Sequence, residues 1–94
     1  MKISEVTIEL MREYLRAETE TDNKFLGEVM SAAKKMISSY TGISDNELDN
    51  YEDLTIAYQL ICSDMYDVRS LTVASDKMNP TVKIILNMHS RNLV

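Results

Sequence analysis

The stretch EYLRAETETDNKFLGEVMSAAKKMISSYTG, Glu13 to Gly42, decides the fold. It predicts the end of one helix, an acidic turn and a long amphipathic helix over residues 22–41. Asp22 or Thr21 can cap the start of that helix, and Gly42 stands where a left-handed residue commonly ends one. Apolar side chains recur along it at steps of three and four residues, which is the period of a single helix face. They are Phe25, Leu26, Val29, Met30, Ala33, Met36, Ile37 and Tyr40.

Similar spacing predicts three more helices, over residues 5–16, 52–70 and 80–91. Ser4 or Thr7 can cap the first, and Asn79–Pro80 gives the last an N-cap followed by proline at the first helical position. Residues 43–51 are expected to form a short irregular connector with about one helical turn, and Ser44 begins a Ser-x-x-Glu capping box there. Two glycines and one proline leave little material for hairpins. We therefore predict one all-α domain spanning residues 1–94.

The helix over residues 52–70 is apolar on two sides. One side belongs to the predicted core, whose members are Leu15, Phe25, Val29, Ala33, Ile37, Leu54, Ile61, Met65 and Leu86. Ile56, Leu60 and Leu71 lie on the opposite side, and a helix that is apolar on both sides is either central or covered from outside. A chain of 94 residues has little other sequence to cover both sides. Packing against helix 5–16 or 80–91 is the alternative.

We therefore predict a subunit interface that includes Ile56, Leu60 and Leu71. Tyr66 belongs to the same candidate surface, and Arg69 is available to pair with an acidic residue of a neighbouring subunit. Met88 lies off the apolar stripe of the last helix, so it is added as a candidate contact with a partner. These six residues are the candidate site.

Composition excludes several classes of function. Ten Lys and Arg against fifteen Asp and Glu give a net charge of −5, which disfavours a nucleic-acid-binding protein. The single cysteine, Cys62, cannot form an internal disulfide and is compatible with a reducing compartment. The sequence contains no run of about 18 apolar residues, so no membrane span is predicted. The first fifteen residues lack the apolar core of a signal peptide, so a cytosolic protein is expected.

No catalytic, metal or cofactor site is expected. Cys62, His89 and an acid such as Asp64 would supply the residue types of a thiol nucleophile. A buried Cys62 and a partly buried, hydrogen-bonded His89 are the favoured interpretation, because free cysteine usually packs as a small hydrophobic side chain. Alternating carboxylates over residues 18–22 match the start of a calcium loop, but the glycine and the final glutamate of such a loop are missing. The sequence predicts a non-enzymatic protein.

The order of the predicted parts resembles a known family. A helix ending in EYLR is followed by the acidic turn ETETDN and the long helix KFLGEVMSAAKKMISSYTG. A connector, the helix LTIAYQLICSDMYDVR and the closing segment PTVKIILNMHSRN complete the chain. This arrangement resembles the small head–tail connector (adaptor) proteins of long-tailed bacteriophages, often described as DNA-packaging proteins, over nearly the whole chain. The segment ILNMHSR is similar to a Leu-Leu-Asn-x-x-Arg ending in that family, with one extra residue before Arg91.

The resemblance implies a structural role in the virion. Such proteins form a dodecamer-like ring beneath the portal protein, extend the DNA channel and dock stopper or tail-completion proteins. DNA would pass through the lumen without sequence-specific binding, and a negatively charged wall suits that passage. The expected locations are the head–tail junction and, during assembly, the cytoplasm of the bacterial host. The alternative is a small cytosolic helical adaptor or regulator acting as a dimer, and a helix-turn-helix repressor is disfavoured by the acidic charge.

Overall fold

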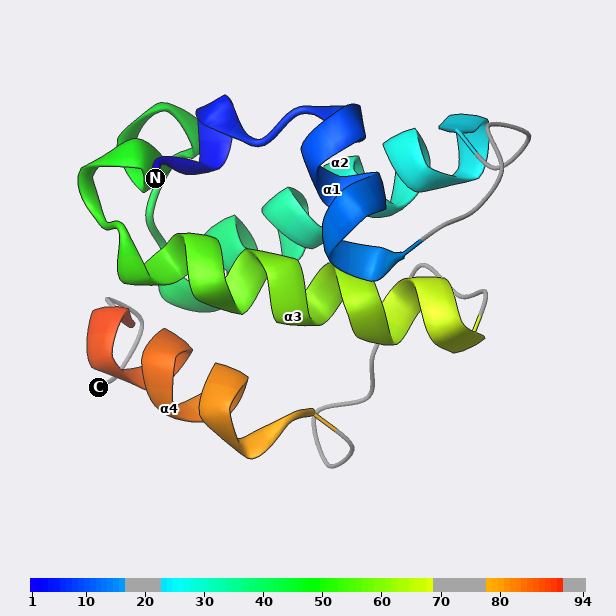
Figure 1. The fold of residues 1–94 in the computed structure, drawn as a ribbon. Helices are drawn as coiled ribbons and strands as arrows, with labels where there is room; N and C mark the ends of the chain where they lie inside the picture. Colours follow the sequence, from blue (N-terminus) through cyan, green and yellow to red (C-terminus); the bar gives the residue numbers. More distant parts are fainter. Residues whose placement is uncertain (17–22, 69–77, 91–94) are drawn as a thin grey trace.

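The structure is a computed structural model that describes residues 1–16, 23–68 and 78–90. Its elements, in chain order, are η1 (Ile3–Glu5), α1 (Ile8–Leu15), α2 (Asn23–Thr41), η3 (Asp45–Asn50), α3 (Asp53–Val68) and α4 (Pro80–His89). The η elements are 3-10 helices, and no strand occurs within these ranges. The predicted all-α class is therefore confirmed, and Figure 1 shows the arrangement of the helices.

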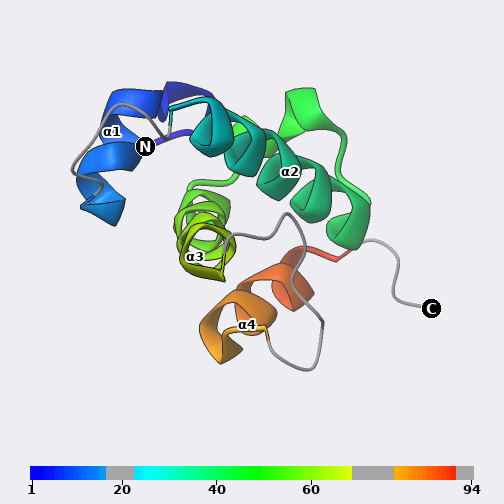
Figure 2. The same ribbon diagram turned by 90° about the vertical axis from the view of Figure 1, so that its right-hand side faces the viewer.

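Helix α3 lies in the middle of the fold. It packs against α2 on one side and α4 on another, and it also contacts α1 and η1. Figures 1 and 2 show that α1 and α4 lie on opposite sides of α3, with α2 behind it in the view of Figure 1. Helices α3 and α4 run in opposite directions, so the end of α4 lies beside the beginning of α3. None of the helices in the described ranges is long and apolar enough to cross a membrane.

The beginning of the chain differs from the prediction of one helix over residues 5–16. The Thr7 Oγ1 accepts a hydrogen bond from the Leu10 N–H at 3.2 Å and caps α1, whereas Ser4 lies in the separate helix η1. Between the two helices Val6 adopts an extended conformation, and both Ile3 and Val6 are buried. The break lets Ile3 of η1 and Val6 of the extended link both reach the core.

Two predicted helix boundaries are confirmed. Gly42 follows α2 with φ at 77°, in the left-handed region, and its N–H donates to the Ser38 carbonyl at 2.9 Å. The Asn79 Oδ1 accepts from the Thr81 N–H at 2.8 Å, with Pro80 in the first turn of α4. The candidate caps Thr21 and Asp22 lie outside the described residues.

The connector over residues 43–51 is more regular than predicted, because η3 occupies six of its residues. Ser44 stands at the N-cap position of η3, but its hydroxyl donates to the Asn46 Oδ1 at 2.8 Å. No hydrogen bond from the backbone of η3 reaches this side chain among the described residues, so the predicted capping box is wrong. The short polar side chain of Asn46 competes for the hydroxyl.

Most of the predicted core is confirmed. Val29, Ala33, Ile37, Leu54, Ile61, Met65 and Leu86 are buried. Leu15 and Phe25 are only partly buried and pack against the edge of this core. Cys62 and Tyr58, one helical turn apart on α3, are also buried. Burial raises the pKa of the Cys62 thiol to about 12, so the thiol is neutral near pH 7 and packs as predicted.

Candidate interaction surface

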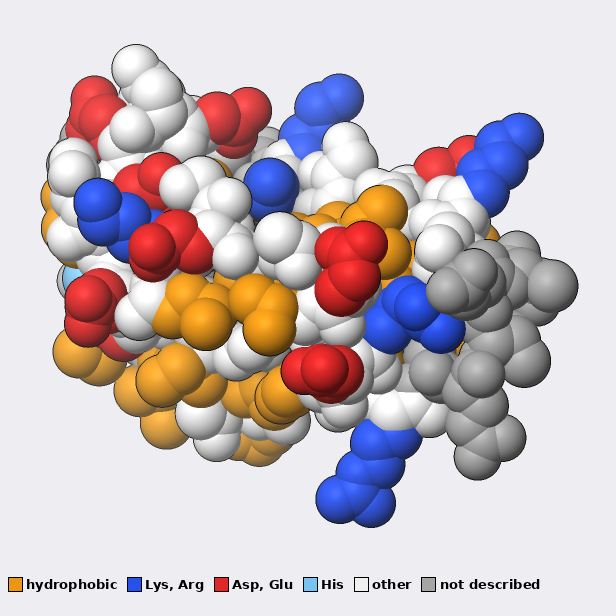
Figure 3. Space-filling view, turned by 45° about the horizontal axis from the view of Figure 1, so that its top comes forward, with side chains coloured by type: hydrophobic (Ala, Val, Ile, Leu, Met, Phe, Trp, Pro, Cys, Tyr) orange, Lys and Arg blue, Asp and Glu red, His pale blue; other side chains and the backbone are white. Residues whose placement is uncertain are grey.

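Large apolar side chains are exposed on α3 and α4. Ile56 of α3 is 52% exposed, and Ile84 and Met88 of α4 are 61% and 69% exposed. Leu60 and Ile85 are partly buried and pack against the core from the same two helices. Figure 3 shows hydrophobic side chains gathered over these neighbouring helices. We call Ile56, Leu60, Ile84, Ile85 and Met88 the α3–α4 face.

Helical spacing explains why these side chains point outward. Ile56 and Leu60 are four residues apart, and so are Ile84 and Met88, which places each pair on one side of its helix. The buried positions of α4, Val82 and Leu86, lie on the other side of that helix. The two helices are adjacent, so the outward pairs lie on the exposed sides of two neighbouring helices.

Polar contacts hold the last turns of α4 in place. The His89 Nε2 lies 2.7 and 2.9 Å from the two carboxylate oxygens of Asp53, at the first turn of α3. The Tyr51 ring lies 4.7 Å from the imidazole, centroid to centroid. The Tyr40 hydroxyl donates to the Asn87 Oδ1 at 2.7 Å and links α4 to α2. His89 is therefore a partly buried, hydrogen-bonded residue, as predicted.

Carboxylates stand at both ends of α3. Asp53 begins the helix and Asp64 and Asp67 lie in its last turns, while no lysine or arginine occurs between Asp53 and Val68. Glu52 directly precedes the helix, and its side chain is 79% exposed. Burial and, to a lesser degree, the neighbouring Asp67 raise the pKa of Asp64. The α3–α4 face is thus an apolar surface with negative charge at both ends of α3.

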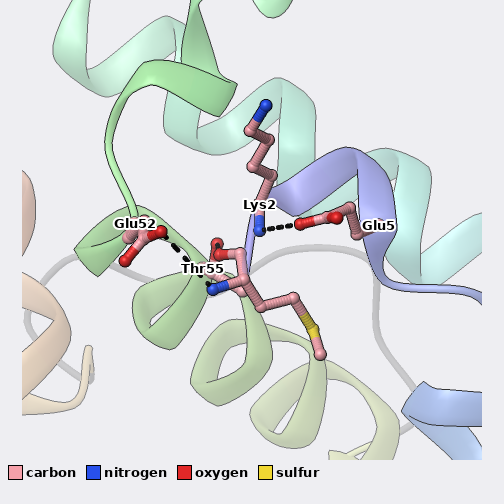
Figure 4. Close-up of polar contacts among 5 residues, drawn as sticks. Lys2, Glu5, Glu52 and Thr55 are labelled. Atoms are coloured by element: carbon pink, nitrogen blue, oxygen red, sulfur yellow. Dashed lines mark hydrogen bonds and ion pairs between the residues drawn. The ribbon is translucent and has the colours of Figure 1, made fainter.

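An open groove of about 410 Å³ lies beside the first turn of α3, lined by Met1, Glu52, Asp53, Thr55, Ile56 and Gln59. Figure 4 shows the contacts that fix the start of the chain there. The Thr55 hydroxyl donates to the Met1 carbonyl at 2.7 Å, and the Met1 ammonium lies 3.8 Å from Glu52. The Lys2 N–H donates to the Glu5 carboxylate at 2.8 Å. Ile56 belongs to both the groove and the α3–α4 face, so the groove is continuous with that face.

Cys62 and His89, two of the residues considered for a thiol site, make other contacts in the structure. Within residues 1–16, 23–68 and 78–90, His, Cys, Asp and Glu side chains do not gather in any group of three or more that could hold a metal ion. Cys62 is buried in the core, while His89 pairs with Asp53 on the surface of α3. Cys62 and His89 are thus engaged in separate packing and polar contacts.

The structure brings together some of the predicted interface residues. Ile56, Leu60 and Met88 share the α3–α4 face. Tyr66 lies elsewhere, with its ring centroid 6.2 Å from that of Phe25 at the beginning of α2. Arg69, Leu71 and Arg91 lie outside the described residues.

Sequence reasoning missed Ile84, although it is one of the most exposed apolar side chains of the described residues. A signal was present, because Ile84 stands four residues before Met88 and off the stripe that contains Val82 and Leu86. Two apolar residues at that spacing on the outer side of a helix form a surface, whereas Met88 alone is unremarkable.

Comparison of the chain with protein-family models, with curated proteins and with solved structures finds no significant match. The function is therefore argued from the surfaces and charges of this chain.

Proposed function

We propose that the chain is a non-enzymatic structural subunit of the head–tail junction of a long-tailed bacteriophage. In this proposal it assembles as a ring of roughly a dozen copies beneath the portal. The ring extends the DNA channel and offers a docking surface to stopper or tail-completion proteins. The exposed α3–α4 face is the observation that carries the proposal, together with the order of helices described from the sequence.

The composition of this face supports a role in assembly. The largest contiguous apolar patches on monomeric proteins measure a few hundred Å², and many of them are interaction sites. Interfaces typically have an apolar centre and a polar rim, and they bury roughly 800 Å² per partner. Ile56, Ile84 and Met88 supply such a centre, and the carboxylates of α3 supply part of a rim.

The net charge of −5 fits a channel component. A protein that binds DNA tightly concentrates lysine and arginine on one face, because each phosphate contact releases counterions. A ring with a negatively charged lumen would instead repel the DNA backbone and let it pass. The proposal therefore predicts no DNA retention by the isolated protein, even at low salt.

A dimeric helical adaptor is the second candidate function. It is favoured by the continuity of the α3–α4 face, since a two-fold contact needs only one self-complementary surface on each copy. A ring needs two different surfaces, one for each neighbour. The oligomeric state therefore distinguishes the two functions.

Native mass spectrometry over a concentration series, with negative-stain microscopy, tests the proposal. A discrete oligomer of about a dozen copies supports the connector role, because closed rings use head-to-tail contacts. Recruitment of a monomer to portal complexes from the same genome supports it as well. A dimer at every concentration favours the adaptor. A monomer that portal complexes do not recruit overturns the connector role.

A further inference from the structure

A second exposed surface lies on α2. Lys24, Glu28, Ser31 and Lys35 are all exposed, and their spacing of four, three and four residues places them along one side of the helix. We call these residues the α2 outer stripe. Gly27 lies beside it, and a Cβ atom added there would meet nothing within 4 Å. Glycine weakens a helix interior relative to alanine, but its lack of a side chain leaves room for another backbone to approach.

The α2 outer stripe and the outer side of α3 point in opposite directions. Helix α2 turns Val29, Ala33 and Ile37 toward the core, and α3 turns Leu54 and Ile61 toward the same core from its own side. Figures 1 and 2 show the two helices packed against each other, with α3 toward the viewer of Figure 1 and α2 behind. One molecule thus presents two different surfaces on opposite sides, which is the requirement for a head-to-tail contact that can close into a ring.

The charges of the two surfaces are complementary. Glu52 and Asp67 are exposed at opposite ends of α3, about 22 Å apart along the helix axis. Lys24 and Lys35 are separated by about 16 Å along α2, and each lysine side chain is long enough to reach a further few Å. Glu28 lies between the lysines and leaves the stripe with a positive balance.

The side chains at the centres of the two surfaces are also complementary in size. Between its terminal carboxylates, α3 presents Ile56 and Leu60, whereas α2 presents the small residues Gly27 and Ser31, with Glu28 between them, in the space between its lysines. Large apolar side chains facing small residues allow two helices to approach closely. Burial and, to a lesser degree, repulsion from Asp67 raise the pKa of Asp64, and a lysine ammonium placed beside the two carboxylates would offset that repulsion.

We propose that the α3–α4 face of one copy docks on the α2 outer stripe of a second copy, with Lys24 and Lys35 pairing with Glu52 and Asp67. This inference rests on the proposed ring and names the two surfaces that form its repeated contact. The contact is heterologous, because each copy uses its α3–α4 face toward one neighbour and its α2 outer stripe toward the other.

Reciprocal charge reversal tests the pairing. K24E/K35E makes the α2 outer stripe negative, and E52K/D67K makes the ends of α3 positive. Each variant alone places like charges across every contact, so association should weaken by roughly tenfold or more. In an equimolar mixture every contact between unlike variants regains opposite charges, so alternating assembly should return. K2E/K83E is the matched control, since it changes two exposed lysines outside both surfaces and should assemble like the parent.

The outcomes separate this inference from the proposed function. Rings formed equally well by the parent and by K24E/K35E would overturn the pairing while leaving the connector role standing. If the parent forms no oligomer, zero-length carbodiimide cross-linking of mixed light and isotope-labelled copies at high concentration provides the second measurement. Cross-links between copies from Lys24 or Lys35 to Glu52 or Asp67 are expected, and their absence overturns the inference. Failure to oligomerise with or without portal complexes overturns the proposed function.

Discussion

The His89 Nε2 lies 2.7 Å from the Asp53 Oδ2, which joins the last turn of α4 to the first turn of α3 across 36 residues of sequence. The same imidazole packs against the ring of Tyr51. Because α4 carries Ile84 and Met88, the position of this short helix determines whether those side chains lie beside Ile56. The pair therefore supports the α3–α4 face without belonging to it.

Removing this pair should loosen α4. His89→Ala loses the hydrogen bond to Asp53 and the contact with Tyr51, and we expect the free energy of unfolding to fall by about 1 kcal/mol. Thermal unfolding followed by circular dichroism measures the change. Lys83→Ala, at an exposed position of the same helix, is the control and should unfold like the parent. Equal melting temperatures for the two variants would show that the pair contributes nothing to docking of α4.

The exposed and buried sides of α3 should respond differently to a charge. Ile56→Glu places a carboxylate in solvent, so we expect a folded protein whose stability changes by no more than about 0.5 kcal/mol, but with weaker self-association. Ile61→Glu places the same group in the core and should unfold the protein. Circular dichroism measures whether each variant is folded, and sedimentation velocity measures its self-association. Unchanged association of the Ile56 variant would remove this residue from the interface.

Leu60 decides how far the interface extends toward the core. It is partly buried and packs against the core, yet it lies one turn after the exposed Ile56. We expect Leu60→Glu to remain folded but to lose about 1–2 kcal/mol of stability, because it exchanges a partly buried apolar side chain for a charge. Urea unfolding measures the loss. An unfolded or molten product would place Leu60 in the core and shift the interface toward α4.

The Tyr58 hydroxyl is expected to lower the free energy of unfolding. It is buried between α2 and α3, and it has no hydrogen-bond partner among the described residues. Tyr58→Phe removes the unpaired polar group and keeps the ring, above which the Lys34 ammonium lies 5.8 Å from the centroid. We expect the free energy of unfolding to rise by about 1 kcal/mol. Tyr40→Phe is the control, because its hydroxyl bonds Asn87 and its loss should lower stability. A destabilised Tyr58 variant would indicate that a buried water satisfies the hydroxyl.

The features of the fold that depend on residues close in the sequence could be predicted. The stripe of α2, Gly42 at its end and Asn79–Pro80 at the start of α4 each rest on local rules that the structure obeys. The break between η1 and α1 could not be predicted in this way. It depends on Ile3 and Val6 reaching a core formed by distant helices, and no local signal reports that core.

The candidate surface was only partly predictable, for a similar reason. A helical wheel separates Ile56 and Leu60 from the core stripe of α3, but it does not show which neighbour covers each remaining direction. Tyr66 lies beside Phe25 because the beginning of α2 comes close to the end of α3. Ile84 is exposed on α4, and it lies near α3 only because α4 packs against that helix. Both facts depend on how the helices pack in three dimensions, which a helical wheel does not show.

The central position of α3 has a consequence for mutational tolerance. Its inner positions pack against α2, α4, α1 and η1, and its first turn also holds Met1 through Thr55 and His89 through Asp53. The outer positions of α2, by contrast, contact solvent along most of the helix. A saturation library scored only for folding should therefore accept many more substitutions in α2 than in α3, although the two helices are similar in length.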